Sequence, residues 1–316
     1  MQKNEFSYKS KDRITDIYAL EWKPDSEIKG VVQVAHGVTE HIGRYEELAQ
    51  FLTSNGYVLI GNDHIGHGLS TNSKKMYFGP KNSFDYVIDD VLECTNIIKN
   101  KYPNIPITLL GFSLGSFVAR AYTIKYPYMV NNLILIGTGY NNELELKIAK
   151  LAALNEARKH GDDQMSSLIK KLTFDTYNKH FTPINTDLDW LCKNKEELNK
   201  FLEDPLRGKI ISAGLFRELL NGMSYSNNVK NIDRMRKDMS ILLLSGAEDP
   251  VGNFTKGVYC VYNLFNNIND VEIKIYNDAR HDILHEKCKE EVYDDISNWI
   301  NLQNKKLNEN KTKIKQ

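Results

Sequence analysis

The sequence predicts an α/β protein with a mostly parallel central sheet and helices on both of its faces. Short apolar runs rich in β-branched residues alternate with helical periods from Gly30 onward, and this alternation is typical of βαβ units. The apolar runs are continuous, as expected for parallel strands that are buried on both faces. A length of 316 residues allows one large core together with an insertion.

Six apolar runs are predicted to form the parallel strands, and a hairpin is predicted to extend the sheet at one edge. The parallel strands are expected at residues 31–35, 57–60, 107–110, 132–136, 240–244 and 271–276. The antiparallel hairpin is expected at residues 6–9 and 15–22. The intervening segments follow the helical period, as at Tyr45, Leu48 and Leu52 in positions i, i+3 and i+7. Helices are therefore expected at residues 44–55, 84–101, 114–125, 258–265 and 291–302.

The interval 140–228 lacks a strong buried strand and contains polar amphipathic segments instead, at residues 144–157, 165–172 and 215–220. We expect a helical cap here, inserted between two core strands, so that residues 1–139 and 229–302 form the core. Ligands of such folds bind beyond the carboxyl ends of the strands, where a long insertion acts as a lid. Ordinary surface elaboration is the alternative. The charged and polar residues 303–316 predict a disordered tail.

Composition excludes several classes of protein. Lys and Arg together number 41, as do Asp and Glu, and a nucleic-acid partner is not expected without a basic excess. Residues 1–6 lack the apolar core of a secretory signal, and no run approaches the ~18–20 apolar residues of a membrane span. Four cysteines without a C-x-x-C pair predict free thiols and a cytoplasmic protein. They are Cys94, Cys192, Cys260 and Cys288.

Residues 111–115 have the sequence Gly-Phe-Ser-Leu-Gly, which matches the G-x-S-x-G pattern of a nucleophile elbow. The pattern follows a predicted strand and opens a predicted helix, which is the context that the elbow requires. This turn would hold the Ser113 hydroxyl near a helix N-terminus, where N–H groups favour developing negative charge. We predict that Ser113 is a catalytic nucleophile and not a structural serine.

A serine nucleophile needs a base and an orienting acid, which follow it in the chain order Ser, Asp or Glu, His. One strand after the cap leads into Glu248 and Asp249, and the next leads into His281 and Asp282. We predict His281 as the base and Asp249 as the acid, because Pro250 rigidifies the turn after Asp249. Glu248 is the alternative acid, and Asp282 is a weaker one.

Other histidines compete with His281 as the base, and His285 is the nearest. Residues 281–285 are similar to the H-E-x-x-H zinc motif. Asp replaces Glu, however, the segment follows a strand, and no third ligand is evident, so no metal is expected. The remaining candidates are expected in a structural loop or on the cap surface: His64, His67, His160 and His180.

The oxyanion of an acyl-transfer intermediate needs two backbone donors. One is the N–H of Leu114, which follows the nucleophile. The other is expected in the loop after the first parallel strand, where Gly37 permits a tight turn. We predict the N–H of Val38 as this second donor.

The chain resembles the monoacylglycerol lipase and lysophospholipase branch of the α/β-hydrolases. Four segments carry the resemblance, in matching order and spacing: residues 36–45 (HGVTEHIGRY), 63–70 (DHIGHGLS), 111–115 (GFSLG) and 280–286 (RHDILHE). The resemblance extends from about residue 30 to residue 299. It implies an α/β-hydrolase fold and hydrolysis of long-chain carboxylic esters through an acyl-enzyme. It assigns the family's nucleophile, acid, base and oxyanion donors to Ser113, Asp249, His281, Val38 and Leu114.

The resemblance is incomplete at two places. Phe112 and Ser116 stand where the branch usually has His and Gly, and the cap matches poorly before residues 204–206, which leaves the substrate open. We expect a monoacylglycerol, a lysophospholipid or a related small ester or lipid as substrate, with no cofactor.

Four alternatives remain: a small-ester carboxylesterase, a serine peptidase, an acyltransferase and a non-catalytic binding protein on the same scaffold. Transient contact of the cap with a membrane surface is also expected. The oligomeric state is left open.

Overall fold

The computed structural model describes residues 1–71 and 74–314, with side chains described as far as residue 309. Within these residues the strands form one eight-stranded sheet in the order β1-β2-β4-β3-β5-β6-β7-β8. Strands β3 to β8 run parallel to one another, and β1 and β2 add an antiparallel edge next to β4. The strand bounds are β1 (Gln2–Lys9), β2 (Asp16–Lys23), β3 (Gly30–Ala35), β4 (Tyr57–Asn62), β5 (Ile107–Phe112), β6 (Asn132–Ile136), β7 (Ser240–Gly246) and β8 (Asp270–Tyr276).

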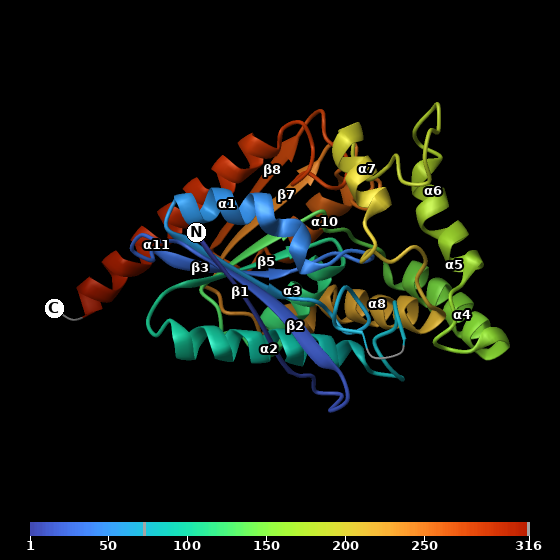
Figure 1. Cartoon of the computed structure of the whole chain (residues 1–316), viewed down its shortest axis with the longest axis horizontal. Coiled ribbons are helices and arrows are strands. Elements are labelled where there is room, and N and C mark those ends of the chain that lie inside the picture. Colours follow the sequence, from blue (N-terminus) through green and yellow to red (C-terminus); the bar gives the residue numbers. More distant parts are fainter. Residues whose placement is uncertain (72–73, 315–316) are drawn as a thin grey trace.

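Helices cover both faces of the sheet (Figure 1). One face packs against α1 (Glu46–Ser54) and α11 (Lys289–Ile314), and the other against α2 (Phe84–Lys101), α3 (Leu114–Lys125) and α10 (Lys256–Leu264). A short 3-10 helix, η1 (Ile42–Tyr45), precedes α1. This architecture agrees with the predicted α/β class and the predicted antiparallel edge.

Strand β3 illustrates why continuous apolar runs form this sheet. All six of its residues are buried. Successive side chains point to opposite faces of a strand, and accordingly Val31 and Ala35 join one core cluster while Val32 and Val34 join the other. Each central strand therefore contributes apolar side chains to two layers of helix packing.

The interval between β6 and β7 is helical and extends beyond the carboxyl ends of the strands, where α4 to α6 lie at the right of Figure 1. We use the term cap for residues 140–228. The helices after β6 are α4 (Glu143–His160), α5 (Ser167–Leu172), α6 (Phe174–Asn178), α7 (Lys195–Glu203), α8 (Ala213–Ser226) and α9 (Val229–Ile232). Helix α8 packs against α3 and thereby joins the cap to the core.

The predicted disorder of residues 303–316 is wrong as far as Ile314, because α11 continues to that residue. Gln303 and Asn304 are buried. The Ser240 hydroxyl donates to Gln303 Oε1 at 3.1 Å, and Asn304 Nδ2 donates to the Lys29 carbonyl at 3.4 Å. These polar contacts hold this end of the helix against the sheet, beyond the apolar stripe of Val292, Ile296 and Trp299 that packs the preceding turns. The last two residues of the predicted tail lie outside the described residues.

Candidate active site

Ser113 lies in the turn between β5 and α3. Its backbone has φ 52° and ψ −117°, a combination that few residues with a side chain adopt. Two glycines make room for the turn. A Cβ atom at Gly111 would lie 2.3 Å from the Gly115 carbonyl oxygen, and one at Gly115 would lie 1.8 Å from the Ala35 carbonyl oxygen. The G-x-S-x-G pattern therefore occurs in the strained strand–turn–helix context that it requires.

His281 and Asp249 follow the ends of the neighbouring strands β8 and β7. His281 Nδ1 donates to Asp249 Oδ2 at 2.9 Å, and both side chains are buried. Asp249 Oδ1 also accepts the N–H of Val251 at 2.8 Å. Within the described residues His281 Nε2 is buried without a hydrogen-bond partner. The carboxylate thus selects the tautomer in which Nε2 can accept a proton.

Ser113 lines a cavity of about 220 Å³ between core and cap residues. The predicted oxyanion donors, Val38 and Leu114, line the same cavity. Apolar side chains form most of its wall, among them Phe117, Leu146, Phe174, Trp190, Phe216 and Leu220. A cavity of this kind accommodates an apolar group next to the serine.

The alternative acids, Glu248 and Asp282, and the alternative base, His285, have other partners. Glu248 Oε1 accepts from Lys193 Nζ at 2.6 Å at a half-exposed position. His285 Nδ1 donates to Asp282 Oδ1 at 2.9 Å. Burial opposes ionisation of Asp282, but the charges of His285 and Arg44 hold the pKa of this carboxyl well below its usual range. Each alternative therefore has a partner outside the His281–Asp249 pair.

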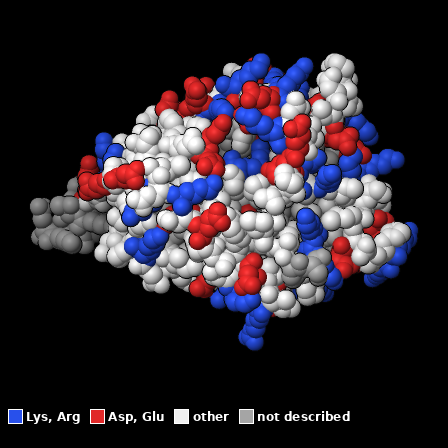
Figure 2. All heavy atoms as spheres, in the orientation of Figure 1, with Lys and Arg blue, Asp and Glu red and all other residues white. Residues whose placement is uncertain are grey.

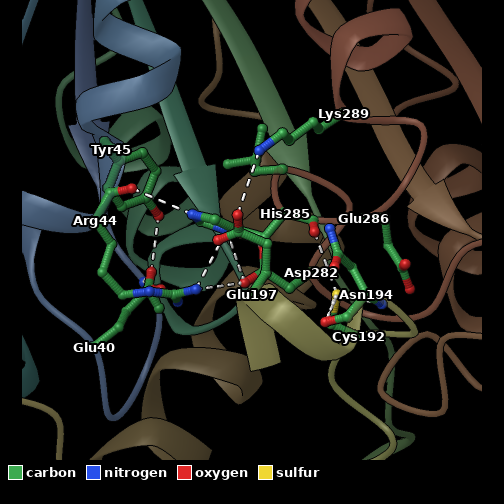
Figure 3. Close-up of polar contacts among 12 residues, drawn as sticks. Glu40, Arg44, Tyr45, Cys192, Asn194, Glu197, Asp282, His285, Glu286 and Lys289 are labelled. Atoms are coloured by element: carbon green, nitrogen blue, oxygen red, sulfur yellow. Dashed lines mark hydrogen bonds and ion pairs between the residues drawn. The ribbon is translucent and has the colours of Figure 1, made fainter. Parts of the chain in front are cut away.

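A buried group of charged residues connects the predicted oxyanion loop to the loop that carries His281 (Figure 3). Glu40 Oε1 accepts the N–H of Gly37 at 2.6 Å. Arg44 donates to Glu40 at 2.5 Å and to Asp282 at 3.0 Å. The motif in residues 36–45 did not indicate this connection, because Asp282 lies 238 positions from Arg44 in the chain.

His64 and His67 lie in a buried cluster with His36. The N–H of His64 donates to His36 Nε2 at 2.9 Å, and the two rings have centroids 4.1 Å apart. Burial lowers the pKa of His64 to about 3 and that of His67 to about 4. Among the described residues no group of three or more His, Cys, Asp or Glu side chains is arranged to hold a metal ion. The two histidines that were expected on the cap surface, His160 and His180, are exposed there.

The sheet order, the elbow and the strand-end residues together define an α/β-hydrolase. The model of the serine aminopeptidase S33 family (Hydrolase_4) matches residues 26–288, and the chain therefore belongs to this family.

Curated relatives place the chain in the monoglyceride-lipase-like branch. Human monoglyceride lipase is 29% identical over 291 residues, which cover 90% of this chain and 86% of that protein. The monoacylglycerol lipase of Mycolicibacterium smegmatis is 26% identical over 305 residues, which cover 94% of this chain and 97% of that protein. These relatives support an ester hydrolase.

Solved structures have the same fold. A thermostable carboxyl esterase from Bacillus coagulans in complex with glycerol has a TM-score of 0.89 and 23% identity, and the match covers 96% of this chain and 99% of that one. The monoacylglycerol lipase of Paleococcus ferrophilus has a TM-score of 0.69 and 20% identity over 91% of this chain and 99% of that one. No helix in the described part of the chain is both long and apolar enough to span a membrane.

Proposed function

We propose that this protein is a serine hydrolase that cleaves carboxylic esters through an acyl-enzyme. The observation that carries the proposal is the combination of an elbow serine in an apolar cavity with a buried His281–Asp249 pair joined at 2.9 Å. The free Nε2 of His281 is the atom that would take the proton from Ser113.

The proposed reaction has two steps. Ser113 Oγ attacks the ester carbonyl while His281 Nε2 takes the hydroxyl proton, and the N–H groups of Val38 and Leu114 stabilise the oxyanion. His281 then gives the proton to the departing alcohol. Water hydrolyses the acyl-enzyme by the same proton transfers, which releases the acid and restores Ser113. Asp249 stabilises the imidazolium and stays ionised throughout.

The substrate that we propose is a monoacylglycerol or a lysophospholipid. The wall of the cavity would bind an acyl chain, because most of the side chains that line it are aliphatic or aromatic. The names of the curated relatives also favour a single-chain lipid ester.

Labelling with a fluorophosphonate, read by intact mass, tests the nucleophile. Labelling is expected at Ser113 alone, together with hydrolysis of nitrophenyl esters and a preference for medium or long acyl chains. Ser113→Ala should lose the label and the activity. Ser116→Ala changes another serine of the same turn and should keep both. A folded wild-type protein that takes no label would favour a binding protein, and a preference for acetyl esters would favour a small-ester carboxylesterase.

Two matched variants test the acid. Asp249→Asn should lower kcat about 10³–10⁴-fold, because the amide would favour the wrong tautomer of His281. Glu248→Gln should keep activity near that of the wild type. The reverse result would assign the acid to Glu248.

Faster hydrolysis of aminoacyl amides than of esters would favour a serine peptidase, and transfer to added alcohols in preference to water would favour an acyltransferase.

We also propose that the cap makes transient contact with a lipid surface. Leu144, Ile148 and Leu151 occupy positions i, i+4 and i+7 of α4 and are 68%, 60% and 67% exposed. This apolar stripe, with Lys147 exposed beside it, is typical of a helix that lies in a membrane interface.

A further inference from the structure

A short segment of the cap lies against the loop that carries His281. We call residues 189–193, between α6 and α7, the strap. The N–H of Asp282 donates to the Leu191 carbonyl at 2.8 Å, and the N–H of Lys193 donates to Glu286 Oε1 at 2.8 Å. Leu191 is buried, so its bond to the loop is shielded from water.

Glu286 joins the strap to the residue before His281. Its Oε1 atom accepts the N–H of Arg280 at 3.0 Å in addition to that of Lys193. Glu286 is 1% exposed, and its Oε2 has no hydrogen-bond partner among the described residues. Figure 3 shows Glu286 next to Cys192 of the strap. The N–H groups of the two residues that flank His281 are thus both tied to the strap, that of Asp282 directly and that of Arg280 through Glu286.

The strap also contacts the imidazole directly. The ring centroids of Trp190 and His281 lie 5.2 Å apart, and those of Phe112, from β5, and His281 lie 5.0 Å apart. Trp190 is buried and lines the cavity that contains Ser113. One aromatic ring of the cap and one of the core therefore constrain the orientation of the imidazole.

We propose that the strap positions His281 and that Glu286 is the positioning residue that fastens it. The role of His281 as base rests on the proposed function. A general base must lie within hydrogen-bond reach of the proton that it takes, and a displacement of about 1 Å reduces the rate about 10²-fold. Because Oε1 alone accepts both bonds, the position needs an acceptor and not a charge.

Two near-isosteric variants separate these requirements. Glu286→Gln keeps an oxygen for both N–H groups and should keep wild-type kcat. Glu286→Met keeps the length but has no comparable acceptor, and it should lower kcat about 10–100-fold on acetyl and decanoyl nitrophenyl esters alike, with a smaller change in KM. Lys289→Met removes nearby ion pairs to Glu47 and Glu197 and serves as the control, with kcat unchanged.

A readout independent of turnover is the downfield proton resonance of the His281 Nδ1–H, assigned by its absence in His281→Gln. It should persist in Glu286→Gln and weaken or shift in Glu286→Met. If the wild-type protein hydrolyses no ester but the resonance responds in this way, the proposed function fails and the positioning role stands.

Three outcomes overturn the strap proposal. The first is a loss of kcat in Glu286→Met that is confined to the decanoyl ester. The second is an equal loss of kcat in both Glu286 variants. The third is a folded Glu286→Met in which both kcat and the His281 Nδ1–H resonance are unchanged. If Glu286→Met does not fold, Trp190→Leu replaces it. That variant removes the contact with the imidazole, and an unchanged kcat on the acetyl ester overturns the proposal.

Discussion

At the scale of single residues, burial determines which protonation states the fold tolerates. His36, His64 and His67 are each at most 1% exposed, and desolvation disfavours the charged imidazolium. Burial and the other two histidines hold the pKa of His36 well below its usual range. The cluster is therefore neutral in the folded protein, and a low pH destabilises the fold because it favours protonation of these histidines in the unfolded chain.

The buried histidines make stability depend on pH. His67 has a pKa of about 4 in the folded chain and 6.5 as its ordinary value, so the unfolded chain binds its proton first as the pH falls. The wild-type protein should therefore lose more stability than His67→Asn as the pH falls. The free energy of unfolding of wild type minus that of His67→Asn should decrease by about 2 kcal/mol between about pH 6.5 and about pH 4.5. Urea unfolding at each pH measures this difference.

The free energy of unfolding must be compared between wild type and variant, because other groups titrate in the same pH range. Burial raises the pKa of Asp90 to about 7, so this carboxyl stabilises the fold as the pH falls and opposes the histidines. His160→Asn replaces an exposed histidine of α4 in the same way and serves as the control for the substitution itself. A constant difference for His67→Asn would contradict the prediction.

At the scale of secondary structure, two amides extend the packing of the C-terminal helix beyond its apolar stripe. Asn304 Nδ2 contacts the Lys29 carbonyl, and Gln303 contacts the Ser240 hydroxyl and approaches Glu272 through its Nε2 at 3.5 Å. Both amides lie on the side of α11 that faces the ends of the strands. The turn that carries Gln303 and Asn304 is thus part of the packed structure, whereas residues 305–309 are exposed or half-buried.

Truncation tests this contribution of α11. A chain that ends after Leu302 should lose about 1–3 kcal/mol of unfolding free energy, because the groups that contact the two amides lose their partners. A chain that ends after Asn308 retains both amides and should unfold like the full chain. Denaturant unfolding of the two truncations gives the comparison. Equal stabilities would show that these hydrogen bonds contribute little.

At the scale of the whole molecule, acidic and basic side chains are interspersed over the face shown in Figure 2, in keeping with equal numbers of the two. The apolar stripe of α4 departs from this polar surface. It lies on the cap, the same part of the chain that lines the cavity with Leu146 and Phe174. A lipid surface at α4 would therefore present its esters near the cap.

Vesicle sedimentation tests the contact of the cap with lipid. Replacing Leu144, Ile148 and Leu151 by Ser should weaken binding to phosphatidylcholine–phosphatidylserine vesicles at least about tenfold, because the apolar area that enters the interface is lost. Hydrolysis of a soluble acetyl ester should stay unchanged, since none of the three lines the cavity. Unchanged vesicle binding would show that this apolar stripe of the cap does not contact the membrane.

Much of the fold was predictable because its signals are local. Continuous apolar runs predict buried parallel strands, and the helix at Leu114–Lys125 has the predicted bounds. The exception was the end of the chain, where polar composition predicts disorder. Amides that bond to Lys29 and Ser240 are partners distant in sequence, and no local pattern contains them.

The candidate site divides in the same way. The sequence by itself determined the elbow around Ser113 and the acidic and histidine loops after two strands, because each depends on neighbouring residues. Only the tertiary structure decided that His281 bonds to Asp249 while Glu248 bonds to Lys193, and that Glu286 ties a cap segment to the His281 loop. Those contacts join segments that meet only after the sheet and the cap have folded together.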